Sequence, residues 1–302
     1  MRLVGHKGEA VQNATDFLRP TRLSASWTTV RCVERSSSYR LRDFSDVPAE
    51  LARLDAQAAA VWAKEAATLR RQGLAPAAHV LEIGCGPGFA SERLLELVPD
   101  GWLTAIDVDS EMVALARDRL RDRERVEVVE ASVAALPFGA ASFDAVTARL
   151  VLEHVPDLAA ALREIRRVLR SGGRLFVVEI DDGWPMLSDP EPPFVAELNA
   201  AEAVMFEARG ADRRLGRRLP QLLADFGFTD VAFDVVTLHT AVDDAAALRQ
   251  MLNSTVFFQR LEESKLVEAD TLAAIRDFVA RYESGEVRVQ FLVAAFIASG
   301  AA

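Results

Sequence analysis

The residues best suited to do chemistry surround a glycine-rich turn. Gly84, Gly86 and Gly88 alternate in the stretch HVLEIGCGPGFAS, and Glu82 stands just before them. Glycines at every second position allow positive φ angles and let a ligand lie against the main chain. A helix that begins directly after such a turn offers unpaired N–H groups to an anionic group. The turn therefore predicts a site for a nucleotide-like cofactor.

Regular elements must hold that turn in place. The apolar run at 79–83 predicts a buried strand, and the apolar spacing at 88–98 predicts an amphipathic helix. The same patterns predict later strands at 102–107, 126–130, 143–148, 174–180, 228–238 and 287–298, and helices at 110–121, 157–170, 195–209, 219–226, 243–263 and 268–282. Repeated strand–helix units indicate a parallel sheet wound on both faces. We predict an α/β, Rossmann-like, doubly wound and mostly parallel seven-stranded sheet.

Two stretches interrupt this alternation. A helical pattern at 47–72 precedes the first strand, so we expect residues 1–74 to form an N-terminal arm and a cap helix. We expect residues 75–302 to form the cofactor-binding domain. Within it, the proline-rich stretch 181–216 breaks the rhythm after the fifth strand. An insertion at this place is expected to cover the substrate as a lid.

Composition restricts the partners. The chain has 302 residues and a formal net charge of −10, which argues against nucleic acid or an anionic membrane surface. Its four histidines are far apart and its two cysteines form no CxxC, so we expect no metal. The apolar runs are too short to span a bilayer, and the N-terminus lacks the apolar core of a signal peptide. We expect a cytoplasmic protein, and leave a homodimer open.

The spacing after the turn decides between cofactor classes. A dinucleotide fingerprint needs Gly or Ala where this chain has Phe89 or Ser91, which disfavours NAD and a dehydrogenase. The acidic residue followed by GxGxG instead resembles the first motif of class I S-adenosylmethionine (SAM)-dependent methyltransferases. Four later segments resemble that family in the right order: TAIDVDSEMVALAR, VEVVEASVAALPF, SFDAVTARLVLEHVPD and REIRRVLRSGGRL. A leader containing Tyr39 and Gln57 is similar to that of bacterial small-molecule members.

The resemblance implies a set of cofactor-binding residues. Asp107 ends the second strand, where a carboxylate can accept two hydrogen bonds from a ribose diol. Many relatives read adenine with an Asp where this chain has Ser132, so a hydroxyl and the Val133 N–H must serve here. Arg149 is expected to face the methionine part of the cofactor. The complete expected set is Tyr39, Gln57, Glu82, Gly84, Gly86, Gly88, Asp107, Val108, Met112, Ser132, Val133 and Arg149.

The expected reaction is methyl transfer from SAM to an oxygen, nitrogen or carbon of a small molecule. Aromatic residues in the insertion suggest an apolar or aromatic acceptor. His154, Glu179 and Asp181 lie near the carboxyl ends of the predicted strands and are the candidate general bases. Two alternatives remain open, because a fold does not determine its chemistry. The chain could catalyse a non-methylating reaction with bound SAM, or act as a SAM-responsive binding protein.

Overall fold

The strands and helices appear in the expected order. The computed structural model describes residues 37–184, 187–241, 243 and 261–302. The chain divides into two compact units, residues 1–34 and 35–302, and all described residues belong to the second. Most of the helix expected at 243–263 lies outside the described residues.

The bounds of the regular elements stay close to the sequence pattern. The described helices are α1 (Val47–Arg71), α2 (Phe89–Leu97), α3 (Ser110–Leu120), α4 (Leu158–Val168), α5 (Val195–Glu207), α6 (Leu219–Asp225) and α9 (Ala269–Glu283). The described strands are β1 (His79–Ile83), β2 (Trp102–Asp107), β3 (Val126–Glu130), β4 (Phe143–Arg149), β5 (Leu169–Glu179), β6 (Leu187–Asp189), β7 (Thr229–His239) and β8 (Gln290–Ala301).

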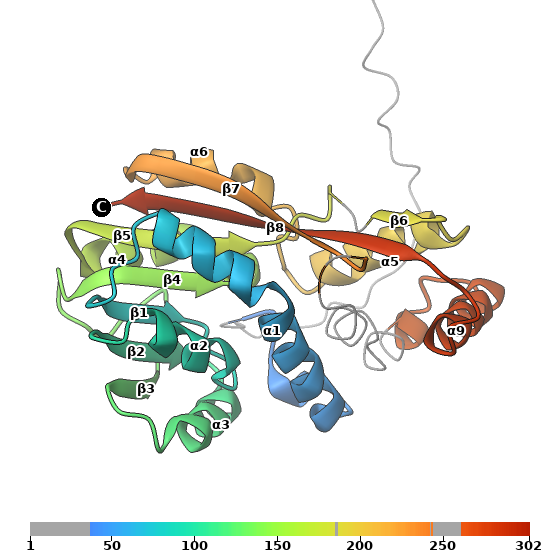
Figure 1. The fold of residues 1–302 in the computed structure, drawn as a ribbon, viewed down its shortest axis with the longest axis horizontal. Coiled ribbons are helices and arrows are strands. Elements are labelled where there is room, and N and C mark those ends of the chain that lie inside the picture. Colours follow the sequence, from blue (N-terminus) through green and yellow to red (C-terminus); the bar gives the residue numbers. More distant parts are fainter. Residues whose placement is uncertain (1–36, 185–186, 242, 244–260) are drawn as a thin grey trace, which may run out of the picture. The chain divides into compact units, whose positions relative to one another are not determined.

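The strands form one mixed sheet (Figure 1). Strands β3, β2, β1, β4 and β5 pair in that order and are all parallel. Strand β8 lies antiparallel between β5 and β7. Helices α2, α3 and α4 join β1 to β2, β2 to β3 and β4 to β5, as in other sheets of this kind, whereas β3 and β4 are connected without a helix. The predicted α/β, Rossmann-like class is confirmed.

Among the described residues the sheet contains eight strands, so the expected number of seven was wrong. Strand β8 pairs with β5 only from Phe296 onward, and its first residues extend beyond the end of β5. Strand β6, inside the predicted insertion, pairs with β8 at Gln290, Phe291 and Leu292. This short strand gives the early part of β8 the neighbour that β5 no longer supplies. A three-residue strand carries too little periodicity to be found in the sequence.

Aspartate caps explain where three of the helices begin. The side chains of Asp46 and Asp157 each accept a hydrogen bond from a backbone N–H three residues later, at 3.0 and 2.8 Å. Asp109 accepts from the N–H of Glu111 at 3.0 Å, at the start of α3. Such caps satisfy N–H groups that the helix leaves without partners. One cap, Asp109, also fixes the chain beside the end of β2.

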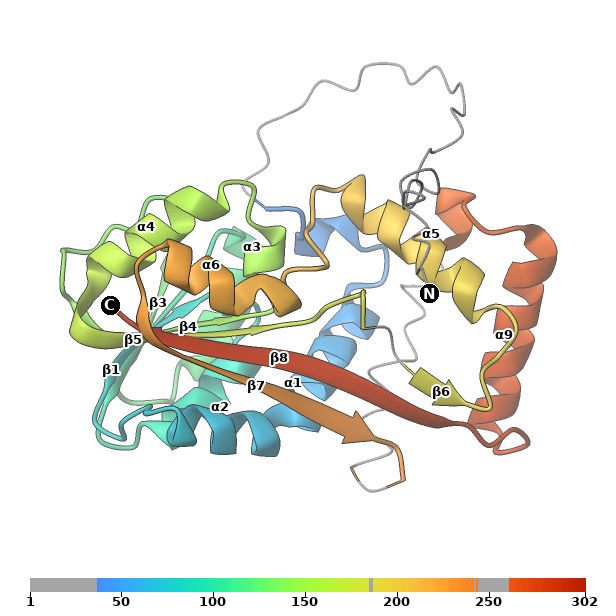
Figure 2. The same ribbon diagram turned by 90° about the horizontal axis from the view of Figure 1, so that it is seen from above.

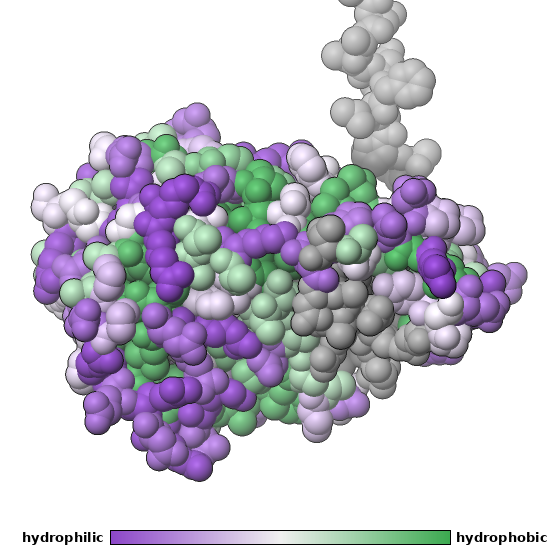
Figure 3. Space-filling view, in the orientation of Figure 1, coloured by the Kyte–Doolittle hydropathy of each residue, from purple (hydrophilic) through white to green (hydrophobic). Residues whose placement is uncertain are grey.

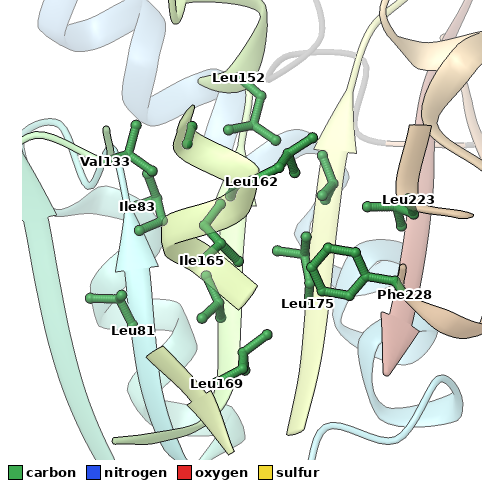
Figure 4. Close-up of a cluster of buried hydrophobic side chains, with 14 of the residues drawn as sticks. Leu81, Ile83, Val133, Leu152, Leu162, Ile165, Leu169, Leu175, Leu223 and Phe228 are labelled. Atoms are coloured by element: carbon green, nitrogen blue, oxygen red, sulfur yellow. The ribbon is translucent and has the colours of Figure 1, made fainter. Parts of the chain in front are cut away.

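The core lies on both faces of the sheet. Successive residues of β1 point to opposite sides, so Val80 packs against α1 and α2 while Leu81 packs against α4. Figure 2 shows α4 and α6 on one side of the sheet and α1 and α2 on the other. Figure 4 shows Leu162 and Ile165 of α4 directed at the strands. Burial on both faces explains why the parallel strands are almost wholly apolar.

Polar and apolar side chains are unevenly spread over the surface. The part of Figure 3 that overlies α2 and α3 is mainly hydrophilic, whereas hydrophobic side chains appear nearer the middle of that face. Large apolar side chains that remain exposed include Trp184, Leu187, Val204, Phe233 and Val235. No helix of the described residues combines the length and the apolar character needed to cross a bilayer.

Truncating a fully buried side chain of α4 tests this packing. Ile165 has no exposed surface and packs between α4 and the sheet. We expect Ile165→Ala to lower the free energy of unfolding by about 2–5 kcal/mol, because it removes buried methyl groups and leaves a cavity. Urea unfolding measures this change. The exposed neighbour Arg163→Ala should change the same quantity by less than about 0.5 kcal/mol.

Candidate functional site

A cavity of about 560 Å³ opens where several parallel strands end. Ile83, Asp107 and Arg149 are the last residues of β1, β2 and β4, and all three line it. Ligands of open α/β sheets bind at this edge. The other expected residues that line the cavity are Tyr39, Gln57, Glu82, Gly84, Val108, Met112, Ser132, Val133 and His154. Gly86, Gly88, Glu179 and Asp181 are not among the lining residues.

The glycine turn is shaped by positive φ angles and by a close neighbour. Gly84 has φ 67°, and a Cβ there would lie 2.4 Å from Val151 Cγ2. Gly86 has φ 53°, and its backbone N–H donates to Asp107 Oδ2 at 2.9 Å. A Cβ on Gly86 would meet nothing within 4 Å. The turn thus excludes a side chain at Gly84 and is tied by Gly86 to the end of β2.

Asp107 is held in a fixed orientation with acceptor capacity to spare. Its Oδ1 accepts from the Asp109 N–H at 2.9 Å, and its Oδ2 accepts from Gly86. Burial raises the pKa of this carboxyl, and the two backbone hydrogen bonds oppose the rise. Each carboxylate oxygen can accept a second hydrogen bond. The free acceptor positions of this carboxylate fit the two hydroxyl donors of a ribose diol, as the resemblance implies.

Glu82 lies at the floor of the cavity. It is buried, and the Ser91 hydroxyl donates to its Oε2 at 2.5 Å. Burial raises the pKa of Glu82 to about 7, with the Ser91 hydrogen bond and the charge of Arg149 acting against the rise. Ser91 stands where a dinucleotide fingerprint would need a small residue. Here it binds the acidic residue that precedes the turn.

The first turn of α3 and the turn after β3 together form a surface that can hold a flat ring and hydrogen-bond to its edge. Met112 is 2% exposed and lines the cavity from the first turn of α3. Ser132 Oγ accepts from the Ala134 N–H at 3.3 Å, which closes a small turn after β3. Val133 is buried beside it. An apolar face next to polar edge groups suits an adenine ring.

Arg149 has a partner that sequence reasoning missed. Its Nε and Nη2 donate to the two carboxylate oxygens of Glu65 at 2.8 and 3.1 Å, and Nη2 also reaches the backbone oxygen of Gln57 at 3.2 Å. Glu65 comes from α1 and is 1% exposed. The guanidinium expected to face the cofactor is therefore anchored by a carboxylate of the protein. A charged residue on the apolar side of the α1 pattern was the available signal.

The leader segment closes one side of the cavity. The Tyr39 hydroxyl donates to Glu50, and Arg53 donates to both oxygens of Glu50 at 2.9 and 2.6 Å. Burial and the charge of Glu50 raise the pKa of Tyr39 well above its usual value. The Ser38 N–H and hydroxyl contact His154 at 3.2 and 2.7 Å. These contacts place Tyr39 on the cavity wall.

His154 lines the cavity in a form ill suited to take a proton. Its Nδ1 is paired with Ser38 Oγ, and its Nε2 lies 3.3 Å from Glu153. Burial lowers the pKa of His154 to about 4, and the charges of Arg213, Arg209 and Arg53 act in the same direction. The imidazole is neutral near pH 7, but both ring nitrogens already have partners. We interpret His154 as a residue that positions the segment around Ser38 and Tyr39.

The other two expected bases do not face the cavity. Glu179 is fully buried, and its Oε1 accepts from the N–H groups of Val151, Leu152 and Glu153 at 3.2, 2.8 and 3.4 Å. Asp181 is bound by Arg217 and by the Gly183 N–H. Both carboxyl groups organise the backbone after β4 and β5. We therefore no longer retain Glu179 or Asp181 as candidate bases.

Another part of the cavity wall is mainly apolar and comes from α5, which lies inside the insertion expected to cover the substrate, and from α9, whose contribution the sequence did not indicate. Helices α5 and α9 supply Leu198, Met205, Phe206, Ile275, Phe278 and Tyr282. Three charged groups stand among them, Glu202, Arg209 and Arg213. The i, i+4 spacing from Leu198 through Glu202 to Phe206 was the signal in the sequence. No group of His, Cys, Asp and Glu in the described part of the chain is arranged to hold a metal.

Known proteins that resemble this chain in sequence include methyltransferases. Residues 81–177 match the family described as a methyltransferase domain. An uncharacterised 37.1 kDa protein in transposon TN4556 of Streptomyces fradiae is 35% identical over 69% of this chain and 60% of its own length. The ubiquinone/menaquinone biosynthesis C-methyltransferase UbiE of Shewanella sp. W3-18-1 is 30% identical over 56% of this chain and 74% of its own.

The fold is also found among solved structures. A crystal structure from Bacillus halodurans, named as a candidate methyltransferase, has a TM-score of 0.50 and 19% identity, covering 79% of this chain and 98% of its own. That likeness concerns the fold alone. The chain spans 60% of the Streptomyces relative and about half of a further curated relative.

The depressed pKa of His154 predicts how stability depends on pH. The folded protein protonates His154 only near pH 4, whereas the unfolded chain does so near 6.5. The unfolded state therefore binds more protons between these values, and the contribution of His154 to stability falls as pH falls through that window. The loss is on the order of 3 kcal/mol.

Urea unfolding of the wild type and His154→Gln from pH 7.5 to 4 measures this contribution. The stability difference between the two proteins should shrink toward acid pH, since contributions from other groups cancel in the difference. A difference that stays constant with pH would contradict the assignment.

Proposed function

The chain belongs to the class I SAM-dependent methyltransferases, and from this premise we propose that it transfers the methyl group of SAM to an oxygen, nitrogen or carbon of a small, apolar or aromatic molecule. The cofactor of this enzyme family is SAM, and S-adenosylhomocysteine is its product. The observation that carries the proposal is the two-ended cavity. One end has polar groups at the strand ends, and the other is lined by apolar side chains of α5 and α9.

The residues at the polar end fit the cofactor. Asp107 would bind the ribose hydroxyls, and Met112 with Val108, Ser132 and Val133 would enclose the adenine. Glu82 would contact the cofactor close to the glycine turn. The remaining members of the proposed set, Tyr39, Gln57, Gly84, Gly86, Gly88 and Arg149, shape or border the same end.

Positioning is the main task left to the protein. When bound, SAM supplies a methyl group on a positively charged sulfur, which needs little activation. The wall formed by Phe194, Phe206 and Phe278 would hold an apolar acceptor and exclude water. Tyr39, held by Glu50, would close the cofactor end. Fixing two reactants in one orientation supplies a large part of the acceleration in such reactions.

The proposed function also assigns a role to each part of the chain. Residues 1–74 would serve as an arm and cap helix, residues 75–302 as the methyltransferase domain, and 181–216 as its lid. Supporting the lid, Arg213 bonds Asp182 at 3.0 and 3.1 Å and Arg217 bonds Asp181, so both ends of the insertion are tied together. Our proposal includes a cytoplasmic location and a small-molecule partner, with a homodimer left open.

Removing the ribose-binding carboxylate tests the cofactor assignment. We expect Asp107→Ala to weaken the binding of S-adenosylhomocysteine at least tenfold, roughly the effect of losing hydrogen bonds to a charged group. Isothermal calorimetry measures it. Asp122→Ala, on an exposed residue after α3, is the matched control and should bind like the wild type. Unchanged affinity in Asp107→Ala would remove this residue from the ribose role.

Product mass separates methyl transfer from the alternatives. Incubation with SAM and a panel of phenols, amines and carbon acids should yield S-adenosylhomocysteine together with an acceptor heavier by one CH2 group. An acceptor changed without gaining that mass would favour a non-methylating enzyme. Tight SAM binding with no product from any acceptor would favour a SAM-responsive binding protein. Tight NAD binding without SAM binding would contradict the proposal.

A further inference from the structure

Helix α5 carries a carboxyl group that has no structural task. Glu202 is partly buried and lines the cavity. Within the described residues, no donor hydrogen-bonds its carboxylate. The other carboxyl groups on the cavity wall all have partners: Glu50 binds Tyr39 and Arg53, Glu65 binds Arg149, Glu82 binds Ser91, Asp107 and Asp109 bind backbone N–H groups, and Glu153 binds Arg213.

The position of Glu202 assigns it to the acceptor end. Leu198 lies one turn before it on α5 and Phe206 one turn after it, and both line the same cavity. From α9, Phe278 and Tyr282 complete the wall. A carboxylate in apolar surroundings is costly unless something binds it. Because no described residue hydrogen-bonds Glu202, its carboxylate is available to accept a hydrogen bond from a molecule bound in the cavity.

Charges around Glu202 restrict the kind of partner. Two guanidinium groups, Arg209 and Arg213, also line the cavity. Asp182, with Arg213, acts on the charge of Glu202. Arg213 additionally stacks over the Phe206 ring, with its Cζ 4.2 Å from the ring centre. Arg213 is paired with Asp182 and Glu153, whereas no described group hydrogen-bonds the guanidinium of Arg209. The positive charge of Arg209 disfavours a cationic amine and stabilises an oxyanion.

We propose that Glu202 is the general base for an acceptor with an apolar ring and an ionisable hydroxyl group, a phenol. This inference rests on the proposed function. The hydroxyl proton moves to the Glu202 carboxylate, and an electron pair of the phenolate forms the bond to the methyl carbon. The electron pair of the broken sulfur–carbon bond stays on sulfur. Glu202 then releases its proton to water.

The proton affinity of Glu202 is suited to this task. Burial raises the pKa of Glu202 to about 7; the charge of Arg213 opposes the rise and that of Asp182 adds to it. Other titratable groups on the surrounding wall include Arg209 from the same segment, Tyr282 from α9, and Glu153 and His154, which interact with Arg213. A base with a pKa near the working pH is most effective, because it is both ionised and able to hold the proton.

Binding of a matched pair of probes tests the assignment without turnover. The full chain, loaded with S-adenosylhomocysteine, is titrated with 1-naphthol and with 1-methoxynaphthalene, which lacks the donor. We expect the wild type to bind 1-naphthol at least about tenfold more tightly, because a charged acceptor strengthens the hydrogen bond. In Glu202→Gln this preference should fall below about threefold. Glu207→Gln, an exposed residue of the same helix, should keep it.

The pH dependence gives a second readout that a purely structural role would not produce. The wild-type preference for 1-naphthol should weaken as pH falls from 8 to 6, since Glu202 becomes protonated near pH 7. The preference of Glu202→Gln should not vary with pH. A preference in Glu202→Gln equal to that of the wild type overturns the proposal. So does a wild type that fails to bind 1-naphthol or to distinguish the two probes.

The affinity for S-adenosylhomocysteine distinguishes a failure of the proposed methyltransferase function from a failure of the proposed role of Glu202. Glu202→Gln should bind it as the wild type does, which shows that the variant is folded and that its cofactor end is intact. A wild type that fails to bind S-adenosylhomocysteine contradicts the proposed function. In that case the probe preference, measured without it, still decides whether Glu202 binds a phenol.

Discussion

The hydrogen bond from the Gly86 N–H to Asp107 joins the turn after β1 to the end of β2. It forms because β1 lies between β2 and β4 in parallel register, so the three strands end at one edge of the sheet. Parallel pairing thus brings together residues that are far apart in the chain. The polar end of the cavity depends on this alignment, since no single segment contains enough groups to make it.

Burial controls the charges at this edge. The carboxyl groups of Glu82 and Asp107 lose water contact, which raises their pKa values, and each is held by hydrogen bonds from neighbouring groups. Arg149 is likewise paired with buried Glu65. Satisfied groups of this kind are rigid, because breaking one bond leaves a buried polar atom without a partner. Glu202 differs from them, because no described residue hydrogen-bonds its carboxylate, and our proposal of a general base rests on that difference.

Catalytic candidates show the limit of reading strand ends from a sequence. Glu179 is the last residue of β5, and His154 and Asp181 follow β4 and β5, which made each a candidate base. The structure gives Glu179 three backbone donors and Asp181 an arginine, and it leaves His154 with a pKa near 4. Residues at a strand end can point into the cavity or toward the following loop. Local pattern does not distinguish these directions, because they depend on the packing of the next segment.

The sequence by itself determined the α/β class, the strand order along the chain and the identity of the cofactor-binding turn. The class and the strand order follow from apolar periodicity, and the turn follows from the steric freedom of glycine. Only the tertiary structure decided that Glu65 anchors Arg149, that β6 extends the sheet, and that Glu202 faces the cavity. Each of these depends on contacts between segments far apart in the chain. Such contacts arise from packing, which no local spacing records.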